Sequence, residues 1–196
     1  MNYKDKIFAT DDLKGKDFIN CEFSDCRFVS TNLRFSSFTN CKFQTCDLST
    51  IVLDLTAFVK CSYPESKLSN LDFSEAKLKD CNFSKAVMKN CVFHQFKTGS
   101  KTEKKKFDLT NASFLHADLS GTIFSSCELK GANFQNSILE TAVFDRCNLR
   151  EANFVSANIS GVNFDTSKVE NTLLDVEGFL MFGNSKGFSL EQIKTL

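Results

Sequence analysis

Residues 21–28 read CEFSDCRF, so that two cysteines lie five positions apart and a phenylalanine follows each at the second position. The spacing extends well beyond this stretch. Steps of five meet a large apolar residue at every position from Phe8 to Phe93, and again, one residue out of phase, from Leu109 to Leu174. Only 42% of the chain is hydrophobic, so thirty-two such centres do not arise by chance and indicate a short internal repeat with a period of five.

A second position of the repeat, two residues before each centre, explains the cysteines. After Lys6, Asp11 and Lys16 it is mostly small, and all nine cysteines occupy it. Cysteine is a small and weakly polar residue that is often fully buried. We therefore interpret the cysteines as core filler, and we expect reduced thiols rather than disulfides or zinc ligands at the Cys21/Cys26 spacing.

Two inward positions in every five fit neither a helix, with period 3.6, nor a strand, with period 2. They fit a chain that turns a corner once per repeat and closes a square coil after four repeats. Cys21, Cys41, Cys61 and Cys81 support this coil length because they are 20 apart. Asp or Asn residues directly before a centre are expected to form local turns through their side chains. Five of them are Asn82, Asp118, Asn133, Asn153 and Asn163.

The repeats GANFQ (131–135), EANFV (151–155), HADLS (116–120), CNLRE (147–151) and CEFSD (21–25) resemble the pentapeptide-repeat family over residues 6–174. This resemblance implies an all-β fold, a right-handed quadrilateral parallel β-helix with a core of stacked centre residues. Four pentapeptides per coil predict about eight coils, with a mid-chain loop and a C-terminal capping segment.

The chain divides into four parts. Residues 1–93 form the first array, whose first coil is expected to be atypical and to act as the N-terminal cap because charged residues fill its small slots. Residues 94–106 form a basic loop, and residues 107–174 form the second array. Residues 175–196 are expected to be a partly helical cap or dimerisation segment. Its predicted contacts are Phe179, Leu180, Met181 and Phe182, and Ser189 with Gln192 predicts a helix start.

The loop supplies the candidate partner-binding residues, although a solvated linker is the alternative interpretation. These residues are Lys97, Lys101, Lys104, Lys105 and Lys106. His94 and His116 belong to no recognisable catalytic motif and are interpreted as surface residues. We therefore expect no catalytic, cofactor-binding or metal-binding residues, and no enzyme activity.

The charge composition limits the classes of partner that the chain is expected to bind. The 24 basic and 24 acidic residues balance, so neither nucleic acid nor a membrane is an expected direct partner. The chain starts without an apolar signal sequence and uses cysteine freely, which favours a cytoplasmic protein.

Two functions follow from the resemblance. The first is a non-catalytic scaffold for an unidentified protein partner. The second is suggested by a branch of the family that mimics duplex DNA, dimerises through its C-termini and protects DNA gyrase from quinolones or toxins. Length, loop and apolar C-terminus resemble that branch, but the zero net charge departs from it. Only residues 107–174 lean acidic, with eight acidic and four basic residues.

Overall fold

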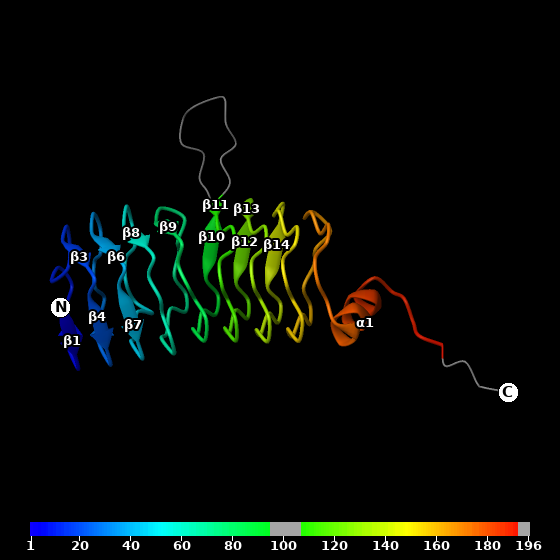
Figure 1. The fold of residues 1–196 in the computed structure, drawn as a ribbon, viewed down its shortest axis with the longest axis horizontal. Coiled ribbons are helices and arrows are strands. Elements are labelled where there is room, and N and C mark those ends of the chain that lie inside the picture. The colour runs from blue at the N-terminus through cyan, green and yellow to red at the C-terminus, as the bar shows by residue number, and fades with distance from the viewer. Residues whose placement is uncertain (95–106, 192–196) are drawn as a thin grey trace, which may run out of the picture.

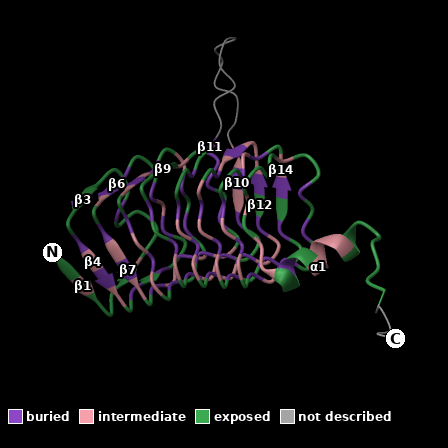
Figure 2. Cartoon of the chain, turned by 45° about the vertical axis from the view of Figure 1, so that its right-hand side comes forward, coloured by how far each residue is buried: buried purple, intermediate pink, exposed green. Residues whose placement is uncertain are grey.

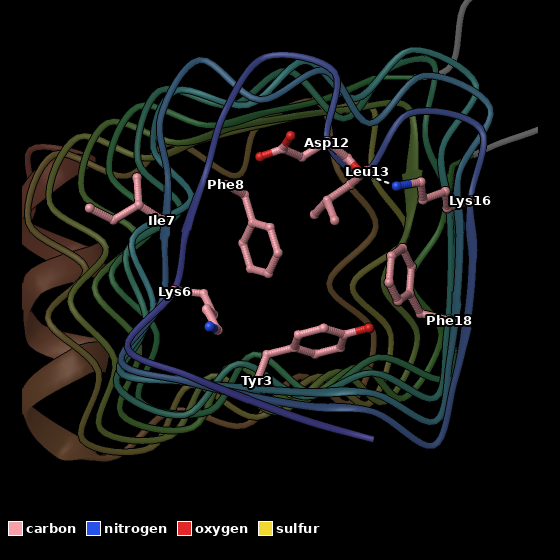
Figure 3. Close-up of a pocket in the computed structure, with 8 residues that line it drawn as sticks. All are labelled: Tyr3, Lys6, Ile7, Phe8, Asp12, Leu13, Lys16 and Phe18. Carbon is pink, nitrogen blue, oxygen red and sulfur yellow. Dashed lines mark hydrogen bonds between the residues drawn. The ribbon is translucent and has the colours of Figure 1, made fainter.

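The structure is a computed structural model that describes residues 1–94 and 107–191. The chain forms a rod of stacked coils, with the N-terminus at one end and a single helix at the other (Figure 1). Viewed from the N-terminal end, the first coil runs clockwise from Tyr3 past Phe8 and Leu13 to Phe18 while the later coils recede (Figure 3). The solenoid is therefore right-handed and four-sided, and the expected β-helix is confirmed.

Each strand is short because a corner interrupts the chain once in every repeat. The strands are β1 Asn2–Lys4, β2 Ile7–Phe8, β3 Asp17–Ile19, β4 Glu22–Ser24, β5 Arg27–Phe28, β6 Ser37–Thr39, β7 Lys42–Gln44, β8 Ala57–Val59, β9 Lys77–Lys79, β10 Val92–His94, β11 Phe107–Asp108, β12 Ile123–Ser125, β13 Cys127–Glu128 and β14 Val143–Asp145. Nearly all contain an apolar centre flanked by outward residues, which is the alternation that a strand requires.

Successive coils pair in parallel, and each residue pairs with the equivalent residue four repeats further along the chain. Phe23 pairs with Phe43, for example, and Phe38 with Phe58. One ladder passes through eight pairings from the first coil to the last, in agreement with about eight coils. Its members are Asn2, Glu22, Lys42, Ser62, Asn82, Ser113, Asn133, Asn153 and Leu173.

The frame shift between the two arrays comes from an insertion into one coil. Val92 pairs with Ile123 and Asn82 with Ser113, so the register across the insertion is 31 instead of 20. The insertion enters after the centre Phe93 and the chain rejoins the coil before the centre Leu109. The core therefore continues across the insertion without a break.

A left-handed residue turns most of the corners. The position two residues after a centre has positive φ in most repeats, as at Asn40 (φ 53°) and Gly131 (φ 66°). The Asp or Asn before the centre supports the next turn, because the Oδ1 of Asn133 accepts a hydrogen bond from the Gln135 amide at 3.0 Å. Asn82, Asp118, Asn153 and Asn163 accept the same bond, which confirms the expected local turns.

The core consists of aromatic columns that run along the rod. The rings of Phe114, Phe134 and Phe154 stack with centroids 4.9 and 4.7 Å apart. Neighbouring columns meet edge to face, as Phe134 does with Phe144 at 85°. Both geometries are favourable for aromatic pairs. The buried core residues run from Leu13 to Phe164, and buried segments recur along the rod in Figure 2.

The helix α1, Val176–Ser185, begins earlier than the sequence suggested. Its N-cap is Asp175, whose Oδ1 accepts a hydrogen bond from the Gly178 amide at 2.8 Å. It ends at Ser185, with Lys186 as its C-cap. Gly187 follows with φ 83°, and the Phe188 amide donates to the Gly183 carbonyl, as in a Schellman motif. The helix start predicted at Ser189 is wrong in the described part, where residues 188–191 are not helical.

Candidate interaction surfaces

The cysteines fill the slot that the repeat predicts. All nine are buried, and none of them forms a disulfide bond. The Sγ of Cys61 donates to the carbonyl of Phe38, in the preceding coil, at 3.3 Å. The Oγ of Ser36 and the Oγ1 of Thr56 occupy the same slot. Each donates to the carbonyl 23 residues earlier in the chain, as Cys61 does. Cysteine, serine and threonine are therefore equivalent here, which confirms the interpretation of the cysteines as core filler.

The environment of several of these thiols suppresses their reactivity. Burial raises the pKa of Cys46 to about 12, that of Cys81 to about 11 and that of Cys91 to about 12. Cys41 differs, because a hydrogen bond from the Cys61 thiol lowers its pKa to about 7, but Cys41 itself is 2% exposed. A thiol reacts as its thiolate and only where a reagent can reach it. In this core, burial limits the access of reagents, and the raised pKa values limit thiolate formation.

Within residues 1–94 and 107–191, no three His, Cys, Asp or Glu side chains come together as metal ligands. A hollow with a volume of about 350 Å³ lies at the N-terminal mouth of the coil (Figure 3). Tyr3, Phe8 and Phe18 line it, and the side chain of Lys6 reaches into the opening. Lys6, Asp11 and Lys16 are exposed, and the first coil still joins the ladder through β1 and β2. Its role as a cap stays a prediction.

The five candidate lysines of the basic loop lie outside the described residues, so the prediction for them is untested. The structure does fix the two ends of the insertion. His94 ends β10, and the buried Phe107 packs its ring 5.9 Å from Phe93. The insertion therefore leaves and re-enters the rod at one corner, between the columns of Phe93 and Leu109.

The four apolar residues of the C-terminal segment lie on α1 and divide into two kinds. Met181 and Phe182 pack against the core, and the Phe182 ring lies 6.1 Å from Phe164 in the last coil. Leu180 is half-buried, whereas Phe179 is 66% exposed. Lys186 also forms an ion pair with Asp165, which attaches the end of the helix to the rod. Met181 and Phe182 thus contact the end of the core, whereas Phe179 and, beyond the helix, Phe188 are exposed.

The acidic second array is largely neutralised. Five of its eight acidic residues form ion pairs with lysine or arginine; they are Asp118, Asp145, Glu151, Asp165 and Glu170. The pair of Lys89 with Asp118 is the best buried of them, at 2.9 Å. Burial would raise the pKa of Asp118, but hydrogen bonds from Ser120 and Lys89 hold it below its usual value. Most acidic groups of this half therefore lie beside cations instead of forming an unbroken acidic surface.

Sequence reasoning missed two exposed apolar residues, Phe35 and Leu55. Both occupy the left-handed corner position and are 58% and 53% exposed. The signal was present in the sequence, because the residue two places after a centre is polar, small or glycine at nearly every other corner. The repeat consensus treats this position as variable and so hides the exception.

The repeat, the four-sided coil and the stacked core together define a pentapeptide-repeat solenoid. The family's sequence profiles match residues 105–174, described as a pentapeptide repeat region, and residues 12–49 and 65–95, described as pentapeptide repeats. The chain belongs to this family. No curated protein sequence matches it.

Solved structures share the fold at low sequence identity. QnrB1, a plasmid-mediated fluoroquinolone resistance protein, is 17% identical over 94% of this chain and 96% of its own, with a TM-score of 0.55. HetL, a pentapeptide repeat protein involved in heterocyst differentiation regulation in Nostoc sp. strain PCC 7120, is 19% identical over 89% of this chain and 87% of its own, with a TM-score of 0.42. The similarity to QnrB1 shows a common fold. In the described part of the chain, the one helix is too short to cross a membrane.

Proposed function

We propose that this protein is a non-catalytic scaffold in the cytoplasm that binds a protein partner through the outer surface of its rod. The observation that supports this proposal is that the inward positions of the repeat are occupied by core residues. Apolar or small residues fill them from Phe18 to Phe164, so over this range the side chains available for a partner are those on the faces and at the corners. Parallel ladders hold these side chains at fixed spacings, which suits recognition rather than catalysis.

The insertion is the part of the surface that we assign to partner contact. Its two ends meet the rod at one corner, and the coils on either side of it pair directly with each other. Loops on rigid scaffolds often carry function for this reason. The sequence of residues 94–106 holds five lysines and one glutamate, which favours an acidic surface on the partner.

A second candidate is binding and protection of a type II topoisomerase such as DNA gyrase, with a homodimer formed through the C-terminus. The overlap with QnrB1 over almost the full length of both chains favours it. Two observations weigh against a DNA mimic, namely the zero net charge and the ion pairs of the acidic half. We therefore rank it below the general scaffold.

The test of the scaffold compares two forms of the chain. Removal of the segment 96–106 leaves Phe93 and Leu109 one repeat apart, so the coil closes in register. Affinity capture with quantitative mass spectrometry should enrich a protein with the full chain and lose it with the deletion form. If the full chain enriches no protein over an unrelated solenoid, the scaffold proposal is wrong. If the partner binds both forms equally, the insertion has no part in binding.

The topoisomerase candidate has its own assay. Gyrase supercoiling is measured in the presence of a fluoroquinolone while the protein is titrated in. Restored supercoiling at micromolar protein supports this candidate, and no recovery removes it while leaving the scaffold proposal intact.

A further inference from the structure

Phe35 and Leu55 are unusual among the corners of the solenoid. Among the described residues with positive φ, they are the large apolar ones; the rest are polar, charged or glycine. Phe35 has φ 64° and Leu55 has φ 53°. Bulky side chains are strongly disfavoured in the left-handed region, where asparagine, aspartate and glycine are common.

Neither side chain is buried in the core, so burial does not offset the cost of this conformation. Both side chains are more than half exposed. The Arg34 guanidinium lies over the Phe35 ring, 5.0 Å from its centroid. A locally strained and exposed apolar pair is a reason to look for a contact outside the chain.

The two residues lie on neighbouring coils of one corner. Val52 pairs with Asn32 and Ala57 with Ser37, so the register on both sides places Leu55 beside Phe35. We call this surface the Phe35 corner. It comprises Phe35 and Leu55 with the outward charged residues on either side of them in the first four coils, which are Lys14, Asp17, Arg34, Asp54, Glu75 and Lys77.

The charges on the Phe35 corner change sign along the rod. On one flank, Lys14 and Arg34 occupy the first two coils and Asp54 the third. On the other flank the order is reversed, with Asp17 in the first coil and Lys77 in the fourth, in one ladder with Ser37 and Ala57. Glu75 follows Leu55 at the corner itself, because the Leu55 amide donates to the Glu75 carbonyl at 3.2 Å.

This arrangement is complementary to itself. Consider a two-fold axis that lies in the plane of contact, perpendicular to the rod and level with the gap between the second and third coils. It brings the first coil of one copy against the fourth coil of the other, and the second against the third. It places Phe35 against Leu55 of a second copy, Arg34 against Asp54, and Asp17 against Lys77. Lys14 then approaches Glu75. Each contact occurs twice, as an isologous interface requires.

We propose that the Phe35 corner is a homodimer interface in which two rods lie antiparallel. The charged groups are free for it, since Arg34, Asp54, Glu75 and Lys77 form no ion pair within the part of the chain that the structure describes. Lys14 pairs with Asp11 at 3.8 Å across an exposed surface, and Asp17 accepts a hydrogen bond from Ser37. The interface is separate from the C-terminal helix and goes beyond the proposed function.

The size of the patch sets the expected strength. Four coils at about 4.8 Å each give a contact roughly 15–19 Å long. A corner strip of this length buries less surface than the roughly 800 Å² per partner of a standard interface. The dimer is therefore weak, with a dissociation constant on the order of 10–100 µM.

The test uses sedimentation equilibrium of the full chain over about 1–500 µM protein at low and high salt, the range that brackets this affinity. Arg34→Asp should weaken the dimer at least about 10-fold, because it opposes like charges at two symmetry-related places. The double variant Arg34→Asp/Asp54→Arg should restore the affinity to within about 3-fold. Asp17→Lys and Asp17→Lys/Lys77→Asp repeat the comparison on the other flank.

Each result decides the matter. Rescue by both charge exchanges supports the antiparallel interface. A chain that stays monomeric over the whole range overturns it. So does a dimer that Arg34→Asp leaves unchanged but that Phe179→Asp removes, since that dimer forms through α1. Loss of affinity without rescue also overturns the proposed pairing.

A stability readout separates this interface from a structural role of the corner. Phe35→Asn and Leu55→Asn should each raise the Tm of the monomer, by about 2 °C, while weakening the dimer. Lys85→Asn is the matched control, because Lys85 has φ 63° at a different corner and should leave the dimer unchanged. A lower Tm for both variants would mean that the two side chains serve the fold, and the proposal would fail.

Discussion

The ring of Tyr63 stacks on Phe83 with the centroids 5.1 Å apart, yet its hydroxyl has no hydrogen-bond partner among the described residues. Tyr63 is 1% exposed and stands in a column of phenylalanines. A buried hydroxyl without a partner costs about 1–3 kcal/mol. We therefore expect Tyr63→Phe to raise the free energy of unfolding by about 1 kcal/mol in urea denaturation.

The control is Tyr3→Phe at the open end of the same column. The Tyr3 hydroxyl donates to the Met1 Sδ at 2.8 Å and is exposed, so this change should be nearly neutral. If Tyr63→Phe is destabilising instead, an internal water serves the Tyr63 hydroxyl.

Replacing a centre residue should lower the free energy of unfolding much more than replacing a cysteine. Phe134→Ala deletes a ring that stacks on Phe114 and Phe154, and the rigid coils above and below cannot close the gap. It should cost about 3–5 kcal/mol. Cys41→Ala leaves a slot that alanine already fills at Ala132, and it should cost about 1 kcal/mol.

Both variants are measured by equilibrium denaturation, with circular dichroism of the native state as a check on the fold. Equal costs for the two would contradict the division into centre and filler positions. Unfolding of Cys41→Ala would show that the thiol has a role that the slot geometry does not explain.

The sequence predicts the core because each inward position recurs along the whole chain. Phe23, Phe43 and their equivalents repeat the same environment, so one misread repeat does not change the register. The insertion is visible for the same reason, as a phase change between Phe93 and Leu109. Local turns such as the one at Asn133 also follow, because their chemistry lies between near neighbours in the chain.

Features that occur once are harder to predict. The sequence predicts a helix start at Ser189, whereas Asp175 caps α1 and its second oxygen also binds the Ser156 amide at 2.7 Å in the preceding coil. That contact joins two coils and leaves no local pattern in the sequence. The exposed Phe35 and Leu55 were missed because a repeat consensus describes what most corners share, and these two depart from it.

Glycine at a corner is required in some coils and optional in others. Gly131 has φ 66°, and a Cβ there would lie 2.4 Å from the Oδ1 of Asn111 in the preceding coil. Gly15 has φ 65° but nothing within 4 Å of that point. Gly15→Ala should therefore cost about 1 kcal/mol for the left-handed conformation alone, and Gly131→Ala should cost more.

A double-mutant cycle isolates the steric part. In the Asn111→Ala background, the cost of Gly131→Ala should fall to that of Gly15→Ala, measured by thermal denaturation. If the cost does not fall, the clash with Asn111 is relieved by rotation of its side chain, and the backbone conformation accounts for the whole effect.

Acid should loosen the C-terminal helix before it unfolds the rod. Hydrogen bonds from the amides of Gly178 and Ser156 lower the pKa of Asp175. A depressed pKa means that this cap stabilises the helix above the ordinary aspartate pKa of about 3.9 and is lost as the pH falls through the lower folded value. Amide hydrogen exchange should therefore quicken at Gly178 and Phe179 below about pH 4, relative to the intrinsic rate, while the Phe134 amide stays protected. Asp175→Ser retains an N-cap acceptor without a carboxyl group, so its exchange should lose this pH dependence. Equal acid sensitivity in Asp175→Ser and the unaltered chain would assign the loosening to another carboxylate, such as Asp165 in its ion pair with Lys186.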